Sequence, residues 1–282
     1  MYDTIVLGGG PAGLQAALTL GRMHRRTLLV DSGVYRNGTV SHAHNLLTND
    51  GRDPAELRAL ARAELAAYAT VETRDAAVSQ VRRDGDALVV EVDGADLRAR
   101  TLVLAMGLHD ELPPIPGLAE QWGDRVANCP FCHGHEFAGR PVAVLNADPH
   151  AQMLARMLGP VASQVLVIDP AEVREVRRTD DGLALLRTDG TVDEVAGAFA
   201  APVSRQRAPF AEQLGLEISE SGGVRTDAFG RTSAPDVYAA GDMAHPAHLP
   251  GPMASLAAAI ASGQLAAVAV VQFFAAEEVT AA

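Results

Sequence analysis

Both cysteines of the 282-residue chain lie in one hexapeptide, CPFCHG, at residues 129–134. Two thiols separated by two residues can close a disulfide across a tight turn and cycle between the dithiol and disulfide forms. A histidine titrates near neutral pH, so His133, directly after the second cysteine, could accept a thiol proton and return it. We therefore expect Cys129 and Cys132 to form a redox-active pair with His133 as their acid–base group.

The same segment has a second interpretation, a zinc site built from Cys129, Cys132, His133 and His135. Structural zinc normally draws its ligands from two separated pairs, which lets them surround the metal. Four ligands within seven residues rarely achieve this, so we expect no metal here and a bystander role for His135.

The composition is that of a soluble globular enzyme, with 48% apolar and 21% charged residues. The net charge of −12 disfavours binding to nucleic acid, whose phosphates would be repelled, and gives no attraction to anionic membranes. All 23 basic residues are arginine, so the chain has neither a Schiff-base lysine nor the lysine of a P-loop.

The two ends of the chain bear on localisation. The N-terminus runs straight into an apolar strand, without the basic region and apolar core of a signal peptide. Residues 256–274 are apolar but Ala-rich and interrupted by polar residues, so we expect a buried helix rather than a membrane span. The expectation is a cytoplasmic protein, in which a cysteine pair serves catalysis or redox sensing rather than structural cross-linking.

A glycine-rich turn between a strand and a helix predicts a dinucleotide-binding fold at the N-terminus. Residues 4–7 have the pattern of a buried strand, residues 8–13 read GGGPAG, and a helical pattern follows. In this context Gly8 permits a tight turn and Gly10 lets the backbone approach a pyrophosphate. Gly13 lets the helix pack closely on the strand, and the helix N-terminus faces the phosphates.

Three further segments complete the motif. Asp31 ends the next strand, residues 27–30, about 20 residues past the loop, where a ribose hydroxyl partner is expected. Residues 232–242 form a strand pattern ending in Gly-Asp, and they resemble the second FAD motif of flavoproteins with two dinucleotide-binding domains. Residues 101–107 resemble the strand and glycine that precede the domain crossover in the same proteins.

The order of these motifs resembles the low-molecular-weight thioredoxin reductases over nearly the whole chain. The resemblance implies an α/β homodimer with two Rossmann-like domains, the second inserted in the first, and FAD as cofactor. The FAD domain would be residues 1–113 and 224–282, and the inserted domain, residues 114–223, would carry the cysteine pair.

The candidate cofactor-binding residues come from the loop, from Asp31 and from this resemblance, whereas His44 is expected to be a solvated loop residue. The candidates are Gly8, Gly10, Pro11, Ala12, Gly13, Asp31, Ser32, Arg36, Asn37, Asn45, Gly107, Gly241, Asp242, Ser255 and Leu256.

The nucleotide loop of the inserted domain is degenerate. Between a strand at 141–145 and a helix starting at 151, Asn146 and Asp148 occupy the two glycine positions. A Cβ at the second position blocks the approach of a pyrophosphate, and the Asp148 carboxylate would repel it. The following strand leads into Asp169 rather than into basic residues for a 2′-phosphate. We therefore expect no NADPH binding in the usual manner.

A cysteine pair followed by His-Gly, together with a degenerate second loop, resembles the thioredoxin-reductase-like dithiol oxidases of the gliotoxin and holomycin type. The resemblance implies that Cys132 lies next to the flavin and that Cys129 exchanges with the substrate. Electrons would pass from a small-molecule dithiol to the enzyme disulfide, then to FAD and O₂. Residues 249–255 also resemble that group, with Ser255 and Leu256 nearest the flavin.

Two other functions stay open. The chain could be a reductase of thioredoxin or a thioredoxin-like protein, supplied with electrons by ferredoxin or through an atypical nucleotide site. It could also be a flavin-bound redox sensor without catalytic turnover, with the cysteine pair as its switch.

Overall fold

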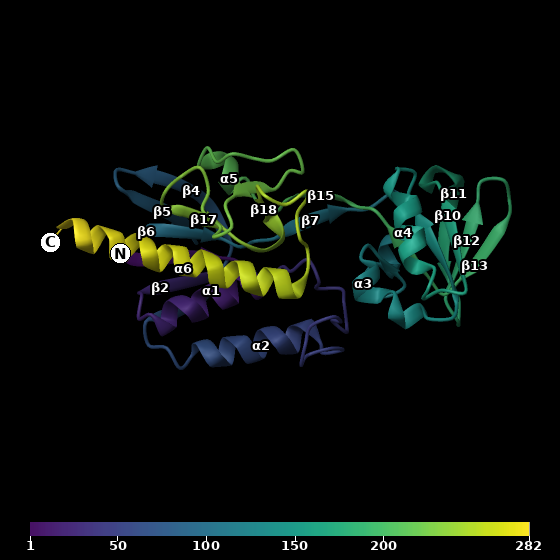
Figure 1. The fold of residues 1–282 in the computed structure, drawn as a ribbon, viewed down its shortest axis with the longest axis horizontal. Coiled ribbons are helices and arrows are strands. Elements are labelled where there is room, and N and C mark those ends of the chain that lie inside the picture. The colour runs from purple at the N-terminus through teal and green to yellow at the C-terminus, as the bar shows by residue number, and fades with distance from the viewer. Residues whose placement is uncertain (282) are drawn as a thin grey trace. The chain divides into compact units, whose positions relative to one another are not determined.

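The computed structural model describes residues 1–281, which divide into two units with separate cores (Figure 1). The first unit comprises residues 1–36, 55–109 and 205 onward, and the second comprises residues 37–54 and 110–204. Each unit combines a parallel sheet with helices, so the predicted α/β class is confirmed.

A seven-stranded sheet forms the centre of the first unit, with the order β3-β2-β1-β6-β5-β4 and with β17 also paired to β6. Strands β1, β2, β3, β6 and β17 run parallel, whereas β4 and β5 are antiparallel to their neighbours. The first half of β6 pairs with β5 and its second half pairs with β17, so two distant segments share one edge. The strands are β1 (Tyr2–Leu7), β2 (Thr27–Asp31), β3 (Val71–Asp75), β4 (Val78–Asp84), β5 (Ala87–Val92), β6 (Ala95–Leu104) and β17 (Val237–Ala239).

The two faces of this sheet carry separate cores because successive residues of β1 point to opposite sides. Val6 packs with α1 (Pro11–Arg22) and α6 (Leu256–Ala281), whereas Ile5 and Leu7 pack on the side of α5 (Phe210–Gln213). Helices α1 and α6 contact each other along much of their length. The remaining elements of the unit are α2 (Pro54–Leu65), β16 (Val224–Thr226), η4 (Gly241–Met243) and β18 (Ala244–Pro246).

The second unit has a four-stranded parallel sheet of order β10-β9-β14-β8 and a three-stranded antiparallel sheet of order β11-β12-β13. The cysteine pair follows β8 directly. The strands are β8 (Val126–Ala127), β9 (Pro141–Leu145), β10 (Gln164–Ile168), β11 (Val173–Arg178), β12 (Leu183–Arg187), β13 (Val192–Val195) and β14 (Gly197–Ala200). The helices are η1 (Ala119–Gln121), α3 (Pro130–His133), η2 (His135–Phe137), α4 (His150–Leu158) and η3 (Pro170–Glu172).

The chain returns to the first unit at Arg205, not at the predicted residue 224. Phe210, Ala211 and Leu216 are buried in the core of the first unit, and these apolar side chains fix the earlier return. The sequence interpretation had placed the hinge at a Gly-Gly pair instead. Where the chain leaves and re-enters, β7 (Leu108–Glu111) pairs with β15 (Val203–Gln206).

Residues 37–54 belong to the second unit, although the sequence interpretation placed them in the FAD domain. The segment is closed by an antiparallel bridge between Ala43 and Arg52. Gly123, with a φ of +90°, lies so close to Thr39 that a Cβ there would meet its hydroxyl oxygen at 2.5 Å. This contact holds the segment against the part of the chain that leads to the cysteines.

One face of helix α6 packs in the core of the first unit. By length and composition its residues Leu256–Val279 could cross a membrane, and 33% of the most apolar stretch is buried. Ala266, Ala267, Val270 and Phe274 are almost fully buried against α1 and the sheet.

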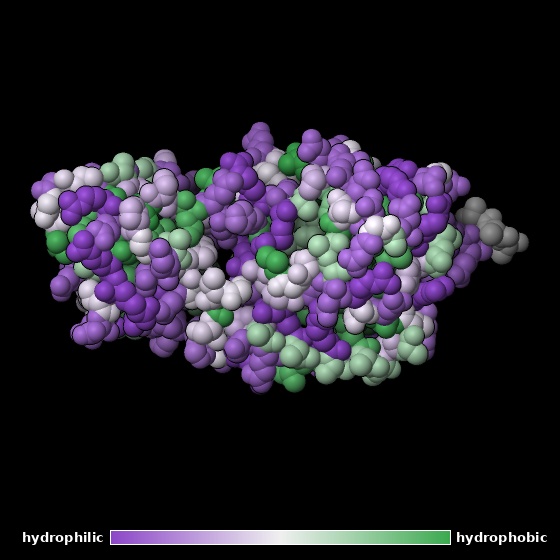
Figure 2. Space-filling view, turned by 180° about the vertical axis from the view of Figure 1, so that it is seen from behind, coloured by the Kyte–Doolittle hydropathy of each residue, from purple (hydrophilic) through white to green (hydrophobic). Residues whose placement is uncertain are grey.

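The surface is polar over most of the face shown in Figure 2, with small apolar areas scattered among hydrophilic residues. Scattered apolar residues of this kind are normal on a protein surface. Most of the large aliphatic residues are used in the buried cores of the two units.

The crossing of α1 and α6 yields the first prediction. Gly263 of α6 lies against the backbone carbonyl of Ala12, so a Cβ at this position would overlap that oxygen. We expect Gly263→Ala to destabilise the holoprotein by about 1–3 kcal/mol, the usual cost of overpacking. The exposed neighbour supplies a control, because Gln264→Ala should change stability by no more than about 0.5 kcal/mol. Thermal unfolding checks both, and equal midpoints for the two variants would contradict the packing argument.

Candidate functional site

The glycine loop at the start of α1 has one closed side and one open side. Gly8 has a φ of +106°, and a Cβ there would come 2.5 Å from the carbonyl oxygen of Ala105. Gly13 lies directly against the carbonyl of Gly8, which leaves no room for a side chain. By contrast, a Cβ on Gly10 would find no atom within 4 Å in the described part of the chain apart from its own chain neighbours. The open side at Gly10, beside Pro11 as first residue of α1, is a cradle of the kind that receives phosphates.

Asp31 joins the end of β2 to this loop. Its carboxylate accepts hydrogen bonds from the Tyr35 hydroxyl at 2.6 Å, from Arg62 and from the Gly33 backbone N–H at 3.1 Å. Burial raises the pKa of Asp31, but these hydrogen bonds and one from the Gly9 backbone outweigh burial, so its pKa lies below the ordinary value. The carboxylate is therefore charged at neutral pH, where it can accept hydrogen bonds from sugar hydroxyls.

Gly9 is a functional position that the sequence interpretation missed. A Cβ on Gly9 would overlap the Asp31 carboxylate, so the loop and the end of β2 fit together only with glycine there. The middle glycine of the GGG run was the available signal, but the standard fingerprint assigns roles only to the other glycines.

A hollow of about 420 Å³ lies beside Asp31 at the ends of β2 and β3. This volume is within the range of small-molecule sites. Ser32, predicted from the sequence, lines the hollow together with Asp31, whereas Tyr35 and Arg62 were not predicted. The lining residues are Asp31, Ser32, Gly33, Tyr35, Arg62, Asp75, Ala76 and Ala77.

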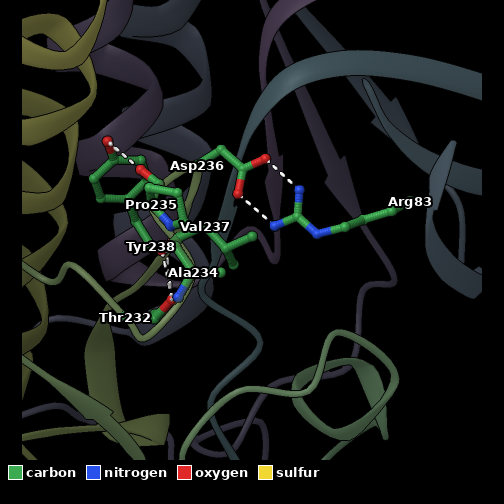
Figure 3. A network of polar contacts seen from close by, with 7 residues as sticks. All are labelled: Arg83, Thr232, Ala234, Pro235, Asp236, Val237 and Tyr238. Atoms are coloured by element: carbon green, nitrogen blue, oxygen red, sulfur yellow. Dashed lines mark hydrogen bonds and ion pairs between the residues drawn. The ribbon is translucent and has the colours of Figure 1, made fainter. Parts of the chain in front are cut away.

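The predicted second FAD segment is anchored before it reaches the loop (Figure 3). Arg83 forms a two-pronged ion pair with Asp236, with N–O distances of 2.6 and 2.5 Å. The Thr232 hydroxyl donates to the Val237 carbonyl at 2.8 Å, and Tyr238 is 1% exposed. These contacts fix the start of β17, which leads directly into Gly241 and Asp242.

The structure brings Gly241 and Asp242 to the first glycine loop. Gly241 has a φ of +73°, and a Cβ there would lie 3.0 Å from that of Ala12. Its backbone N–H donates to the Ser262 hydroxyl of α6 at 2.9 Å. Asp242 forms an ion pair with Arg36 at 2.8 Å. Arg36, Ala12 and the Gly-Asp segment therefore form one cluster in the first unit.

The remaining candidates differ in their placement. Gly107 has a φ of +69° and no protein atom within 4 Å of its Cβ position. Ser255 caps α6, since its hydroxyl accepts a hydrogen bond from the Ala258 N–H at 3.1 Å, and Leu256 is the first residue of the helix. Asn37 and Asn45 lie in the second unit, not in the unit of the glycine loop.

The cysteine pair is set in one short turn of helix in the second unit. Cys129 precedes α3, and its carbonyl accepts hydrogen bonds from the backbone N–H groups of Cys132 and His133, each at 3.2 Å. Both cysteines are half-buried. The turn holds them three residues apart, which is the spacing that a reversible disulfide requires. Among residues 1–279, no group of three or more metal-ligating side chains is brought together.

His133 is held largely in its neutral form. Burial lowers its pKa below the ordinary histidine value, and the nearby His44 acts in the same direction. The Glu136 carboxylate, the Gly123 backbone and Asp124 raise the pKa but do not overcome burial. Within residues 1–279, Nδ1 of His133 is buried and has no hydrogen-bond partner. A neutral imidazole with an unoccupied buried nitrogen is suited to accept a proton.

His44 has a defined role, contrary to the expectation of a solvated loop residue. Its side chain is 23% exposed, with Nδ1 3.6 Å from Asp50 and Nε2 3.4 Å from Glu136. It therefore connects the segment 37–54 to the helical turn η2, directly after the cysteine pair. Asn45, its neighbour, has a φ of +60° and donates its backbone N–H to Asp50 at 2.7 Å, so it shapes the same loop.

The second nucleotide loop is closed by its own side chains. The Asp148 carboxylate accepts a hydrogen bond from the His150 N–H at 2.7 Å, and the Asn146 side chain accepts one from the Asp148 N–H at 3.0 Å. The slight burial of Asp148 raises its pKa, but hydrogen bonds involving Asn146, His150 and Ala151 outweigh burial. The pKa therefore lies below the ordinary value, and the carboxyl group is ionised at neutral pH. At the end of β10, Asp169 caps η3 by accepting from the Ala171 N–H at 2.9 Å. A carboxylate thus lies at the N-terminus of α4, where a nucleotide-binding loop would hold a pyrophosphate.

Comparison with known proteins decides the family. The model of the pyridine nucleotide-disulphide oxidoreductases matches residues 2–170 and 161–270. The chain belongs to this family. Thioredoxin reductase aclD of Aspergillus oryzae is 33% identical, covering 99% of this chain and 98% of its own. Thioredoxin reductase sirT of Leptosphaeria maculans is 31% identical, covering 87% and 88%.

A solved structure extends the likeness to the fold. The Bacillus anthracis protein solved under the name thioredoxin reductase TrxB superposes with a TM-score of 0.89 and 26% identity, covering 98% of this chain and 99% of its own. The architecture is therefore that of the low-molecular-weight thioredoxin reductases, with two Rossmann-like domains. Members of this family bind FAD and act on disulfides, so the chain is an FAD-dependent disulfide oxidoreductase. The open cradle at Gly10, the hollow beside Asp31 and the adjoining Gly-Asp segment fit such a dinucleotide.

A matched pair of substitutions tests the cradle. In Gly9→Ala the new Cβ would overlap the Asp31 carboxylate, so we expect a loss of about 1–3 kcal/mol in the stability of the apoprotein and a low FAD content. Gly10→Ala meets no protein atom, so its apoprotein should unfold like the wild type. Its FAD affinity should nevertheless fall by roughly tenfold or more, because the Cβ would meet the pyrophosphate. Normal FAD affinity in Gly10→Ala, measured by fluorescence titration, would place the phosphates elsewhere.

Proposed function

We propose that this FAD-dependent oxidoreductase is a dithiol oxidase. It converts a small-molecule dithiol to the disulfide through Cys129 and Cys132, and O₂ is the final electron acceptor. The observation that carries the proposal is the carboxylate of Asp148 at the N-terminus of α4.

The Asp148 contact argues against NADPH as electron donor. A dinucleotide would have to displace a charged carboxylate from the backbone N–H of His150 and would be repelled by it. The end of β10, where basic residues would be expected to hold the 2′-phosphate of NADPH, carries the acidic Asp169 instead. Without NADPH as donor, the electrons that reduce the enzyme disulfide come from the dithiol substrate.

The exchange begins with the disulfide form of Cys129 and Cys132. A substrate thiolate attacks the sulfur of Cys129, the Cys129–Cys132 bond breaks, and Cys132 leaves as a thiolate. The second substrate thiol then attacks the first substrate sulfur, which closes the substrate disulfide and releases Cys129 as a thiolate. The substrate has lost two electrons and two protons, and the enzyme dithiol has gained the two electrons.

His133 handles a proton in this exchange. The second substrate thiol must lose its proton to become a nucleophile. The neutral imidazole of His133, through its unpaired Nδ1, can take that proton. We assign Cys129 to the exchange with substrate and Cys132 to the transfer toward the cofactor.

The first unit supplies the cofactor site. Gly8, Gly10 and Gly13 would hold the pyrophosphate at the start of α1, Asp31 the ribose, and Asp242 with Arg36 the segment beyond it. FAD, when bound there, supplies a two-electron acceptor that O₂ can reoxidise with formation of H₂O₂.

A second candidate function is the reduction of thioredoxin or a thioredoxin-like protein with a donor other than NADPH. The observation in its favour is that the relatives aclD and sirT carry the name thioredoxin reductase. The net charge of −12 disfavours docking of an acidic thioredoxin. Anaerobic photoreduction with ferredoxin, followed by an assay for thioredoxin reduction, separates this function from the oxidase.

Electron flow supplies the test of the proposal. Aerobic enzyme mixed with dithiothreitol should form one H₂O₂ per disulfide, and dithiothreitol should bleach the flavin absorbance under anaerobic conditions. NADPH should leave that absorbance unchanged. Cys132→Ser should keep FAD but lose H₂O₂ formation by about a hundredfold or more, because the electron path is broken. Rapid bleaching by NADPH would instead make the protein a nucleotide-driven reductase.

The burial of His133 predicts the pH dependence of the exchange. Since its pKa is lowered, the base is neutral at pH 7, and its contribution should be lost only below the ordinary histidine value of about 6.5. Glu136 raises the pKa, so Glu136→Gln should move this acid limb to still lower pH. The measurement divides the exchange rate of the wild type, and that of Glu136→Gln, by the rate of His133→Gln at the same pH. This ratio removes the effect of substrate ionisation on the rates. An acid limb above pH 7 would exclude the neutral imidazole as the base.

A further inference from the structure

One large side chain beside the thiols is left in solvent. Phe131 lies between the two cysteines and is 67% exposed, whereas Phe137 and Phe199 of the same unit are 2% and 0% exposed. Those two rings pack edge to face, with centroids 6.0 Å apart. Single exposed apolar residues are common on proteins and carry little meaning by themselves. The position of Phe131 is what makes its exposure informative.

Phe131 flanks the reacting sulfurs. It precedes Cys132 in the single turn of α3, where consecutive residues are about 100° apart around the helix axis. A substrate that bonds to Cys129 or Cys132 must therefore come close to this turn, in which Phe131 lies. No aspartate, glutamate or arginine stands in residues 126–134, although the Glu136 and Asp124 carboxylates lie close enough to raise the pKa of His133.

A second exposed apolar side chain, that of Leu47, belongs to a segment that contacts the residues around the cysteine pair. Leu47 is 90% exposed in the segment 37–54. That segment reaches the turn after the cysteines through His44, whose Nε2 is 3.4 Å from Glu136. It also contacts Gly123 through Thr39. The His44–Glu136 and Thr39–Gly123 contacts hold the loop that bears Leu47 against the segments on either side of α3, which bears Phe131.

We propose that Phe131, supported by Leu47, is the specificity-determining contact for the carbon skeleton of the dithiol. An apolar dithiol, aromatic or aliphatic, would cover the phenyl ring as its thiolate reaches Cys129, whereas a hydrophilic dithiol would gain nothing from that contact. The substrate class is thus a small apolar dithiol. This inference rests on the proposed oxidase function.

The test compares two dithiols on the same variants. Initial rates of H₂O₂ formation give kcat/KM for 1,2-benzenedimethanethiol and for dithiothreitol. Phe131→Ala should lower kcat/KM for the aromatic dithiol by roughly tenfold or more, the size expected for loss of an apolar substrate contact, and change that for dithiothreitol by less than about twofold. Phe131→Leu should recover most of the loss, and Leu47→Ala should lower the aromatic rate by a smaller factor. Met153→Ala, which removes another exposed apolar side chain of the unit, should leave both rates unchanged.

The outcomes separate this inference from the proposed function. If the wild type oxidises both dithiols and Phe131→Ala affects both equally or neither, the role of Phe131 is wrong and the oxidase stands. If the wild type forms no H₂O₂ with either dithiol, the oxidase function fails and the inference fails with it. Selective loss of the aromatic rate, with dithiothreitol turnover intact, supports both.

Discussion

The N-termini of two helices, α1 after β1 in the first unit and α4 after β9 in the second, differ in whether they are open to a ligand. Such a terminus presents unpaired backbone N–H groups and attracts an anion. In the first unit the place is open, because Gly10 has no side chain and, among residues 1–281, no atom beyond its chain neighbours lies within 4 Å of its Cβ position. In the second unit the Asp148 carboxylate already accepts from the N–H of His150. The same local geometry is therefore an open helix N-terminus in one unit and a closed cap in the other.

The open glycine loop depends on contacts between distant residues, and the spacing of motifs in the sequence predicts only some of them. The glycine pattern predicted the tight turn at Gly8, the helix contact at Gly13 and the acid at the end of β2. It could not show that Gly9 must lack a side chain, because the reason is the carboxylate of Asp31 in another strand. The partners of that carboxylate, Tyr35 and Arg62, carry no motif of their own. The Arg36–Asp242 pair spans 206 residues, and both of its members were found only because two separate motifs suggested them.

The errors have a common physical cause. The return to the first unit was placed at a Gly-Gly pair, yet Phe210, Ala211 and Leu216 set it earlier by entering that unit's core. His44 was expected to be solvated, yet Glu136 from beyond the cysteine pair holds it. Local signals such as glycine pairs and polar loops describe the chain over a few residues. Burial and ion pairing between distant segments are tertiary properties, and they override those signals.

The second unit keeps its parallel sheet although its nucleotide loop is closed, and the position of the cysteine pair gives a reason. Strand β8 is paired to β14 in that sheet and ends two residues before Cys129. Behind the pair, Gly134 packs so tightly that a Cβ would lie 2.5 Å from the carbonyl of Pro130 and 3.5 Å from Leu158 of α4. Helix α4 thus packs against the turn that follows the two cysteines. The sheet and α4 therefore hold the short helical turn that carries the two sulfurs, and this support does not depend on a bound nucleotide.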